Sequence, residues 1–80
     1  MEKPIQARDK RVHCEFCGVV GTLIRQERNA LGLSQRELAQ KVGIDRVSLT
    51  SMEEGRQHIP VHLLYLLAAA LNMPVTGLLP

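Results

Sequence analysis

The stretch that decides the fold is QRELAQKVGIDRVSLTSMEE, residues 35–54, which carries two short helical patterns on either side of Gly43. Glycine accepts the left-handed backbone that a sharp turn needs, so Gly43 marks the junction. Because the connection is short, the two helices cannot lie antiparallel and must cross steeply. Ala39 supplies the small side chain that a close crossing requires. The stretch therefore predicts two short helices joined by a tight turn.

Local signals set the ends of both helices. Ser34, followed three residues later by Glu37, forms a capping box that starts the first helix. Asp45 is suited to cap the second helix, and Gly55 is suited to end it. The predicted inward-facing residues are Leu38, Ala39, Val42, Leu49 and Met52.

The rest of the chain adds helices around this pair. Apolar residues recur at helical spacing over residues 19–31, and Gly32 follows as a stop. A strongly apolar helix is predicted over residues 60–71, with Pro60 in its first turn. Pro74 then opens a last short turn.

Length and composition favour one all-α domain. The 80 residues are 45% apolar but only 2% aromatic, which suits a helical bundle and not a β-sandwich. We expect a compact bundle of about five short helices over residues 19–80, after a partly flexible N-terminal arm, residues 1–18. So short a chain leaves little room for a catalytic cleft, and we expect neither an enzyme nor a cofactor.

Charge is unevenly distributed along the chain. A formal net charge of +2 is too small to identify a nucleic-acid binder by itself. Every Lys, Arg, Asp and Glu lies between Glu2 and Arg56, so residues 57–80 carry no formal charge apart from histidine. The longest apolar stretch, Val61 to Leu71, is shorter than the ~20 residues of a membrane span, and we find no secretion signal. We expect a cytoplasmic protein that does not enter a membrane.

The second helix of the central pair offers an outward face suited to double-stranded DNA. A B-DNA major groove, about 12 Å wide, accepts such a helix. The residues expected to read bases are Arg46, Val47, Thr50 and Ser51. Arginine suits guanine O6 and N7, and valine suits the thymine methyl. The residues expected to contact phosphates are Gln35, Ser48 and Arg56.

Residues 20–79 resemble the phage-repressor, Xre/Cro-type helix-turn-helix family, whose fold is lambda-repressor-like. The resemblance rests on Leu33-Ser34-Gln35, Leu38-Ala39, Gly43, Ser48-Leu49, Glu53-x-Gly55, Ile59 and Leu64-x-x-Leu67-Ala68-x-x-Leu71. It implies a sequence-specific DNA-binding transcriptional regulator, with a base-reading third helix and a homodimer on a palindromic operator. It also implies that Arg28 and Glu53 form a structural pair.

The uncharged C-terminal segment is the predicted dimer interface. So short a chain cannot hide all of its C-terminal apolar side chains in one core, and an exposed apolar patch usually marks a partner site. The residues expected at the interface are Tyr65, Val75, Leu78 and Leu79.

The N-terminal arm contains a Cys-x-x-Cys pattern with a neighbouring histidine. A zinc site on His13, Cys14 and Cys17 is an alternative, but a structural zinc takes four ligands and the chain has no second cysteine pair, so His58, His62 or a second chain would have to complete it. A reversible disulfide is another alternative. We expect no bound metal here, with the cysteines as free thiols.

Three functions remain open from the sequence. We expect a repressor or autoregulator of a compact operon or mobile element. The alternative is an antitoxin, or another interaction module with secondary DNA binding, whose apolar surface binds a small protein partner. A third interpretation is a thiol or zinc sensor that acts through Cys14 and Cys17.

Overall fold

The computed structural model describes the backbone of residues 10–79 and the side chains of residues 17–79. Within these residues the chain forms four α-helices and one 3-10 helix, and no strand. In chain order the elements are α1 (Lys10–Ala30), α2 (Gln35–Val42), α3 (Arg46–Glu53), α4 (Val61–Ala70) and η1 (Val75–Leu78). The predicted all-α class is confirmed, with four α-helices and a 3-10 helix in place of about five helices.

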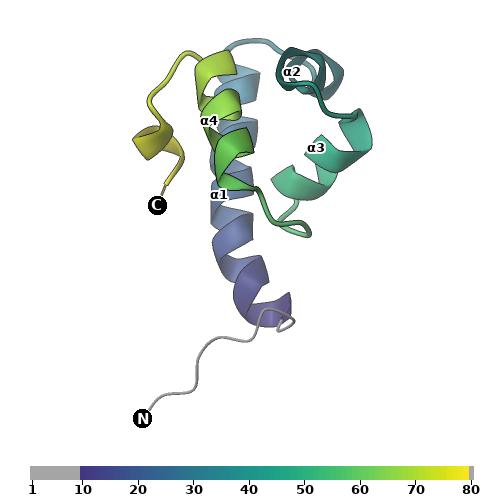
Figure 1. Ribbon diagram of the computed structural model, residues 1–80, viewed down its shortest axis with the longest axis vertical. Helices are drawn as coiled ribbons and strands as arrows, with labels where there is room; N and C mark the ends of the chain where they lie inside the picture. The colour runs from purple at the N-terminus through teal and green to yellow at the C-terminus, as the bar shows by residue number, and fades with distance from the viewer. Residues whose placement is uncertain (1–9, 80) are drawn as a thin grey trace.

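The first helix begins earlier than the sequence pattern predicts. The pattern places residues 10–18 in a partly flexible arm, whereas α1 starts at Lys10 and includes them. Once the inner face of α1 is packed, each further turn costs little, because a growing helix adds a hydrogen bond for each residue that it orders. No proline interrupts this part of the chain. Figure 1 shows these first turns of α1 extending beyond the other helices, and residues 1–9 of the arm lie outside the described residues.

The core is built from the inner faces of all five elements. Helix α1 packs against α3 and η1, and α4 packs against α2 and η1. The main cluster of buried apolar residues is Val20, Ile24, Leu38, Ala39, Val42, Leu49, Met52, Leu63, Leu67, Ala68, Leu71 and Leu78. All five residues predicted to face inward on α2 and α3 are in this set. None of the helices in the described part of the chain is long and apolar enough to cross a bilayer.

Leu78 corrects one sequence prediction. It was expected at a dimer interface, but its side chain is 0% exposed within the single chain. The 3-10 helix η1 packs on both α1 and α4 and places Leu78 in the core. A buried side chain has no surface left for a partner, so Leu78 contributes to the fold.

Both ends of α2 follow the local signals, whereas Asp45, at the start of α3, makes no side-chain capping hydrogen bond. The Glu37 amide donates to Ser34 Oγ at 3.0 Å, and the Ser34 amide donates to Glu37 Oε1 at 2.8 Å, which completes the predicted capping box. Gly43 ends α2 with a φ of 81°, in the left-handed region that favours glycine. The start of α3 is thereby fixed relative to α2.

Gly21 allows α1 to approach the end of α3 closely. A Cβ atom at this position would lie 2.3 Å from the Met52 carbonyl oxygen and 2.6 Å from the Glu53 carbonyl oxygen. Both atoms belong to the backbone and cannot rotate away as a side chain can. This contact sets how α3 sits on α1.

Candidate nucleic-acid interface

Helix α3 has one buried side and one outward side. Leu49 and Met52 are buried and hold the helix on the core. On the outward side Val47 is 62% exposed and Arg46 is exposed. Thr50 and Ser51 are half-buried. The four residues predicted to read bases thus occur on this short helix, but only the first two are largely exposed.

A buried ion pair holds the end of α3. Arg28 Nε donates to Glu53 Oε2 at 2.7 Å, and Arg28 Nη2 donates to Glu53 Oε1 at 3.0 Å. Arg28 Nη1 also donates to the Leu33 carbonyl at 2.9 Å. These bonds join three parts of the chain, namely α1, α3 and the turn that precedes α2. The pairing expected of Arg28 and Glu53 is therefore present. A two-point arginine–carboxylate contact is among the stronger polar interactions, because both partners are charged and their geometries match.

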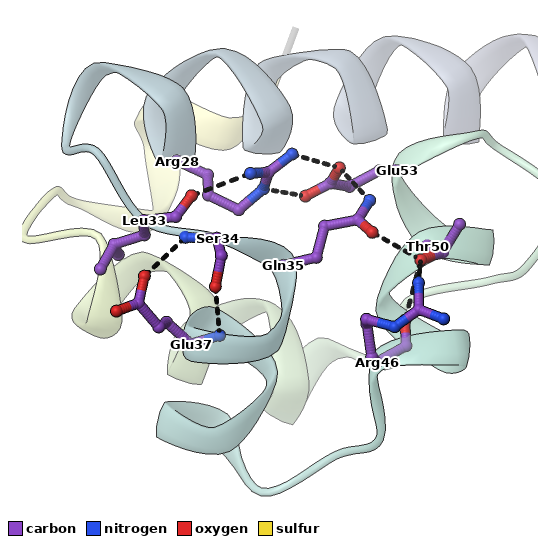
Figure 2. A network of polar contacts seen from close by, with 8 residues as sticks. All are labelled: Arg28, Leu33, Ser34, Gln35, Glu37, Arg46, Thr50 and Glu53. Atoms are coloured by element: carbon purple, nitrogen blue, oxygen red, sulfur yellow. Dashed lines mark hydrogen bonds and ion pairs between the residues drawn. The ribbon is translucent and has the colours of Figure 1, made fainter.

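Gln35 connects this pair to the outward side of α3, as Figure 2 shows. Its Nε2 donates to Glu53 Oε1 at 3.0 Å, and its Oε1 accepts from Thr50 Oγ1 at 2.9 Å. Arg46 Nη1 lies 3.5 Å from the same Thr50 oxygen. A continuous chain of polar contacts therefore runs from the core to the exposed Arg46.

The predicted phosphate contacts lie on three different elements. Gln35 is the first residue of α2, Ser48 lies in α3, and Arg56 follows α3 and is exposed. Arg56 pairs with the exposed carboxylate of Glu54. Exposed pairs of this kind contribute little to stability, so Arg56 is able to exchange its partner for a phosphate.

Hydrogen bonds lower two carboxyl pKa values near the ends of α2 and α3. The backbone amide and then the hydroxyl of Ser34 hold the pKa of Glu37 below its usual value. The Ser48 hydroxyl does the same for the pKa of Asp45. Ser48, predicted as a phosphate contact, is half-buried on α3.

The other predicted sites lie away from α3. Tyr65 is 59% exposed, Leu79 is 43% exposed and Val75 is half-buried. Cys17 is a free, buried cysteine, while the side chains of His13 and Cys14 lie outside those that the structure describes. Among the described side chains there is no group of three or more His, Cys, Asp or Glu placed to hold a metal.

Sequence reasoning missed two features of this site. Gly21 was not singled out, although an isolated glycine inside a helical pattern is itself a signal of close packing. Gln35 was assigned to a phosphate, and its links to Glu53 and Thr50 were not foreseen. Those partners lie 18 and 15 residues away, so no local pattern indicates them.

A family model described as helix-turn-helix matches residues 24–78. An uncharacterized HTH-type transcriptional regulator from Methanothermobacter thermautotrophicus is 44% identical over 51 residues, which cover 64% of this chain and 74% of that protein. The restriction-modification controller protein C.AhdI from Aeromonas hydrophila has a similar crystal structure, with 32% identity and a TM-score of 0.76 over 78% of this chain and 94% of that one. The clp gene regulator ClgR from Corynebacterium glutamicum gives 27% identity and a TM-score of 0.77 over 79% of this chain and 67% of that one.

Proposed function

This chain belongs to the helix-turn-helix family of DNA-binding transcriptional regulators, and we propose that it is a cytoplasmic, dimeric repressor or autoregulator that reads a palindromic operator. The relatives are regulators and not enzymes, and the chain is of the same kind. C.AhdI is named as a controller of a restriction-modification system and ClgR as a regulator of a clp gene. Control of a compact operon by this protein is in keeping with both.

The outward side of α3 is the observation that carries the proposal. Arg46 and Val47 are exposed beside one another at the N-terminal end of this helix, where recognition helices contact base edges. We assign Arg46 to guanine O6 and N7, and Val47 to a thymine methyl. Ser51 completes the base-reading surface with a hydroxyl group. Thr50 contacts bases or supports a residue that does.

Phosphate contacts at the edges of α3 hold this helix in register. Gln35 has a second Nε2 hydrogen beyond the one donated to Glu53, and this hydrogen is suited to a phosphate oxygen. Arg56 reaches a phosphate by leaving Glu54, and the Ser48 hydroxyl is a further donor suited to a phosphate oxygen. Such contacts position a protein on DNA without reading its sequence.

The dimer contact is proposed on the exposed face of α4 and the residue that follows η1. Val61 and Tyr65 on α4 are largely exposed, and Leu66 and Leu79 are exposed over a little less than half of their surface. Val61 and Tyr65 are four residues apart, so they are neighbours on the helix surface. Neither α4 nor η1 carries a Lys, Arg, Asp or Glu, so a partner covers this face without burying a formal charge. Figure 1 shows η1 on the side of α4 away from α2 and α3.

Selection from a pool of random duplex DNA tests the proposal. We expect enrichment of an inverted repeat whose half-sites lie about one helical turn apart, because two copies related by a two-fold axis present two α3 helices. Equilibrium sedimentation of the free protein should give the mass of a dimer. Enrichment of one unrepeated half-site by a monomer would contradict the dimer. A monomer that co-purifies with a second small protein would favour the antitoxin alternative.

A further inference from the structure

We infer that Gln35 and Thr50 form a positioning relay, which connects the buried ion pair to Arg46 and orients its guanidinium toward a base. The inference rests on the proposed function, because it concerns how α3 selects its base. It assigns Gln35 and Thr50 a positioning role, in addition to the phosphate contact predicted for Gln35 and in place of the base contact predicted for Thr50. Neither residue needs to touch a base in order to affect which base is preferred.

The Glu53 carboxylate sets the direction of every hydrogen bond in the relay. An ionised carboxylate only accepts, so the group that faces it must donate. The Gln35 amide therefore turns its Nε2 toward Glu53 Oε1, at 3.0 Å. Its Oε1 is left facing Thr50 Oγ1, at 2.9 Å, and an amide oxygen only accepts. The orientation of the Gln35 side chain follows from these two contacts.

The Thr50 hydroxyl consequently donates its proton to another group of the protein. Oγ1 lies 2.9 Å from Gln35 Oε1 and 2.9 Å from the Arg46 carbonyl oxygen, and both of these atoms are acceptors. In the relay the single proton lies on the bond to Gln35 Oε1, and the lone pairs of Oγ1 remain to accept a hydrogen bond. Arg46 Nη1, at 3.5 Å, is the donor that faces this oxygen.

The contact to Arg46 is long and orients the side chain without locking it. At 3.5 Å this contact is longer than the roughly 2.7–3.2 Å of ordinary N–H···O hydrogen bonds and is only weakly attractive. A long side chain loses rotamer freedom on binding, and a contact that already favours one orientation reduces this loss. The guanidinium keeps further N–H donors for guanine. Thr50 thus favours the orientation of Arg46 in which a base is read.

Two near-isosteric substitutions remove the relay. Gln35→Met and Thr50→Val eliminate its donors and acceptors with little change in volume. Gln40→Met, at an exposed position of α2, and Thr76→Val, at an exposed position of η1, are the matched controls. The readout is the affinity for the selected operator relative to duplexes changed at the one base that Arg46 reads.

We expect each relay variant to lose about tenfold in discrimination at that base. The double variant should lose no more than either single variant, because both break the same chain of contacts. Thr50→Ser keeps the hydroxyl and should keep the discrimination, and the two control variants should behave as wild type. Additive losses in the double variant would overturn the relay. The relay would also be overturned if Gln35→Met weakened binding to all duplexes by the same factor and had a flatter salt dependence. That result would show that Gln35 acts as a phosphate contact alone.

The free protein provides a readout that does not need DNA. In NMR spectra the side-chain amide signals of Gln35 and the Nε–H signal of Arg46 should both shift in Thr50→Val, while the backbone signals of α1 stay in place. Unchanged side-chain signals would overturn the relay even if Gln35→Met failed to fold. A wild-type protein with no base preference at all would instead refute the proposed function, and this outcome is separate from the NMR result.

Discussion

The Arg28 guanidinium and the Glu53 carboxylate make a two-point ion pair that joins α1 to α3, with N–O distances of 2.7 and 3.0 Å. Both residues are buried. Charges withdrawn from water are costly unless each is paired and hydrogen-bonded, and here Gln35 and the Leu33 carbonyl complete the set of partners. The pair thus fixes the C-terminal end of α3, the proposed recognition helix.

Removing one member of this pair should destabilise the protein severely. Glu53→Ala leaves Arg28 buried without its counter-charge, and we expect a loss of about 3–5 kcal/mol in the free energy of unfolding. Glu54→Ala, at the next residue, breaks only an exposed pair and should cost less than about 1 kcal/mol. Urea melts of both variants measure the difference. Equal, small losses would show that the pair contributes only weakly.

Two glycines of α1 should respond in opposite ways to alanine. Gly21→Ala places a methyl group 2.3 Å from the Met52 carbonyl oxygen, so α1 and α3 must move apart, at a cost of about 1–3 kcal/mol. A methyl group added at Gly18 would meet no other atom within 4 Å, and Gly18→Ala should gain up to about 1 kcal/mol from helix propensity. Thermal melts rank the two variants. A Gly21→Ala variant as stable as wild type would argue against close packing of α1 on α3.

In the C-terminal segment, substitution of a core residue should lower stability, whereas substitution of a proposed interface residue should change the oligomeric state. Leu78→Ala empties a fully buried position and should cost about 2–5 kcal/mol of stability. Tyr65→Asp places a charge on the exposed face of α4 and should leave the helical circular dichroism unchanged while it shifts the mass in solution toward the monomer. Sedimentation and chemical denaturation of both variants check this. A Tyr65→Asp variant that stays dimeric would place the interface elsewhere.

The capping box should make stability depend on pH in a known direction. The pKa of Glu37 lies below its ordinary value of 4.5 in the folded protein because the Ser34 amide and hydroxyl bond the carboxylate. A group with a lowered folded pKa stabilises the fold above the unfolded pKa, and this contribution disappears as the pH falls through the folded pKa. Wild type should therefore exceed Glu37→Gln in stability at pH 7, and the difference should shrink below pH 4.5. A difference that is constant from pH 7 to pH 3 would speak against a role for the charge.

Local sequence signals predicted the central part of the fold well. The capping box, the left-handed Gly43 and the inward-facing residues of α2 and α3 all depend on residues close in the chain. The start of α1 was not predicted, because helix propagation through residues 10–18 follows from packing elsewhere in the helix. The burial of Leu78 was not predicted either, because it depends on where η1 returns to the core.

The candidate site was predicted in part. The exposure of Arg46 and Val47 follows from the helical period once Leu49 and Met52 face inward. The connections of Gln35 join α2 to α3, and only the three-dimensional crossing of these helices brings the atoms together. Residue identity showed that Gln35 is able to bond a phosphate, but it could not show which protein groups already bond it.

A base-resolved binding assay of Arg46→Ala tests most directly whether α3 reads DNA. Each position of the selected operator is replaced in turn, and the affinity of wild type, Arg46→Ala and Arg56→Ala is measured for every duplex. Arg46→Ala should lose about 1–3 kcal/mol at one base position in each half-site, whereas Arg56→Ala should weaken binding to all duplexes alike and reduce the salt slope by about one. An Arg46→Ala variant whose affinity falls equally for every duplex would contradict base reading by α3 and leave Arg46 as a phosphate contact.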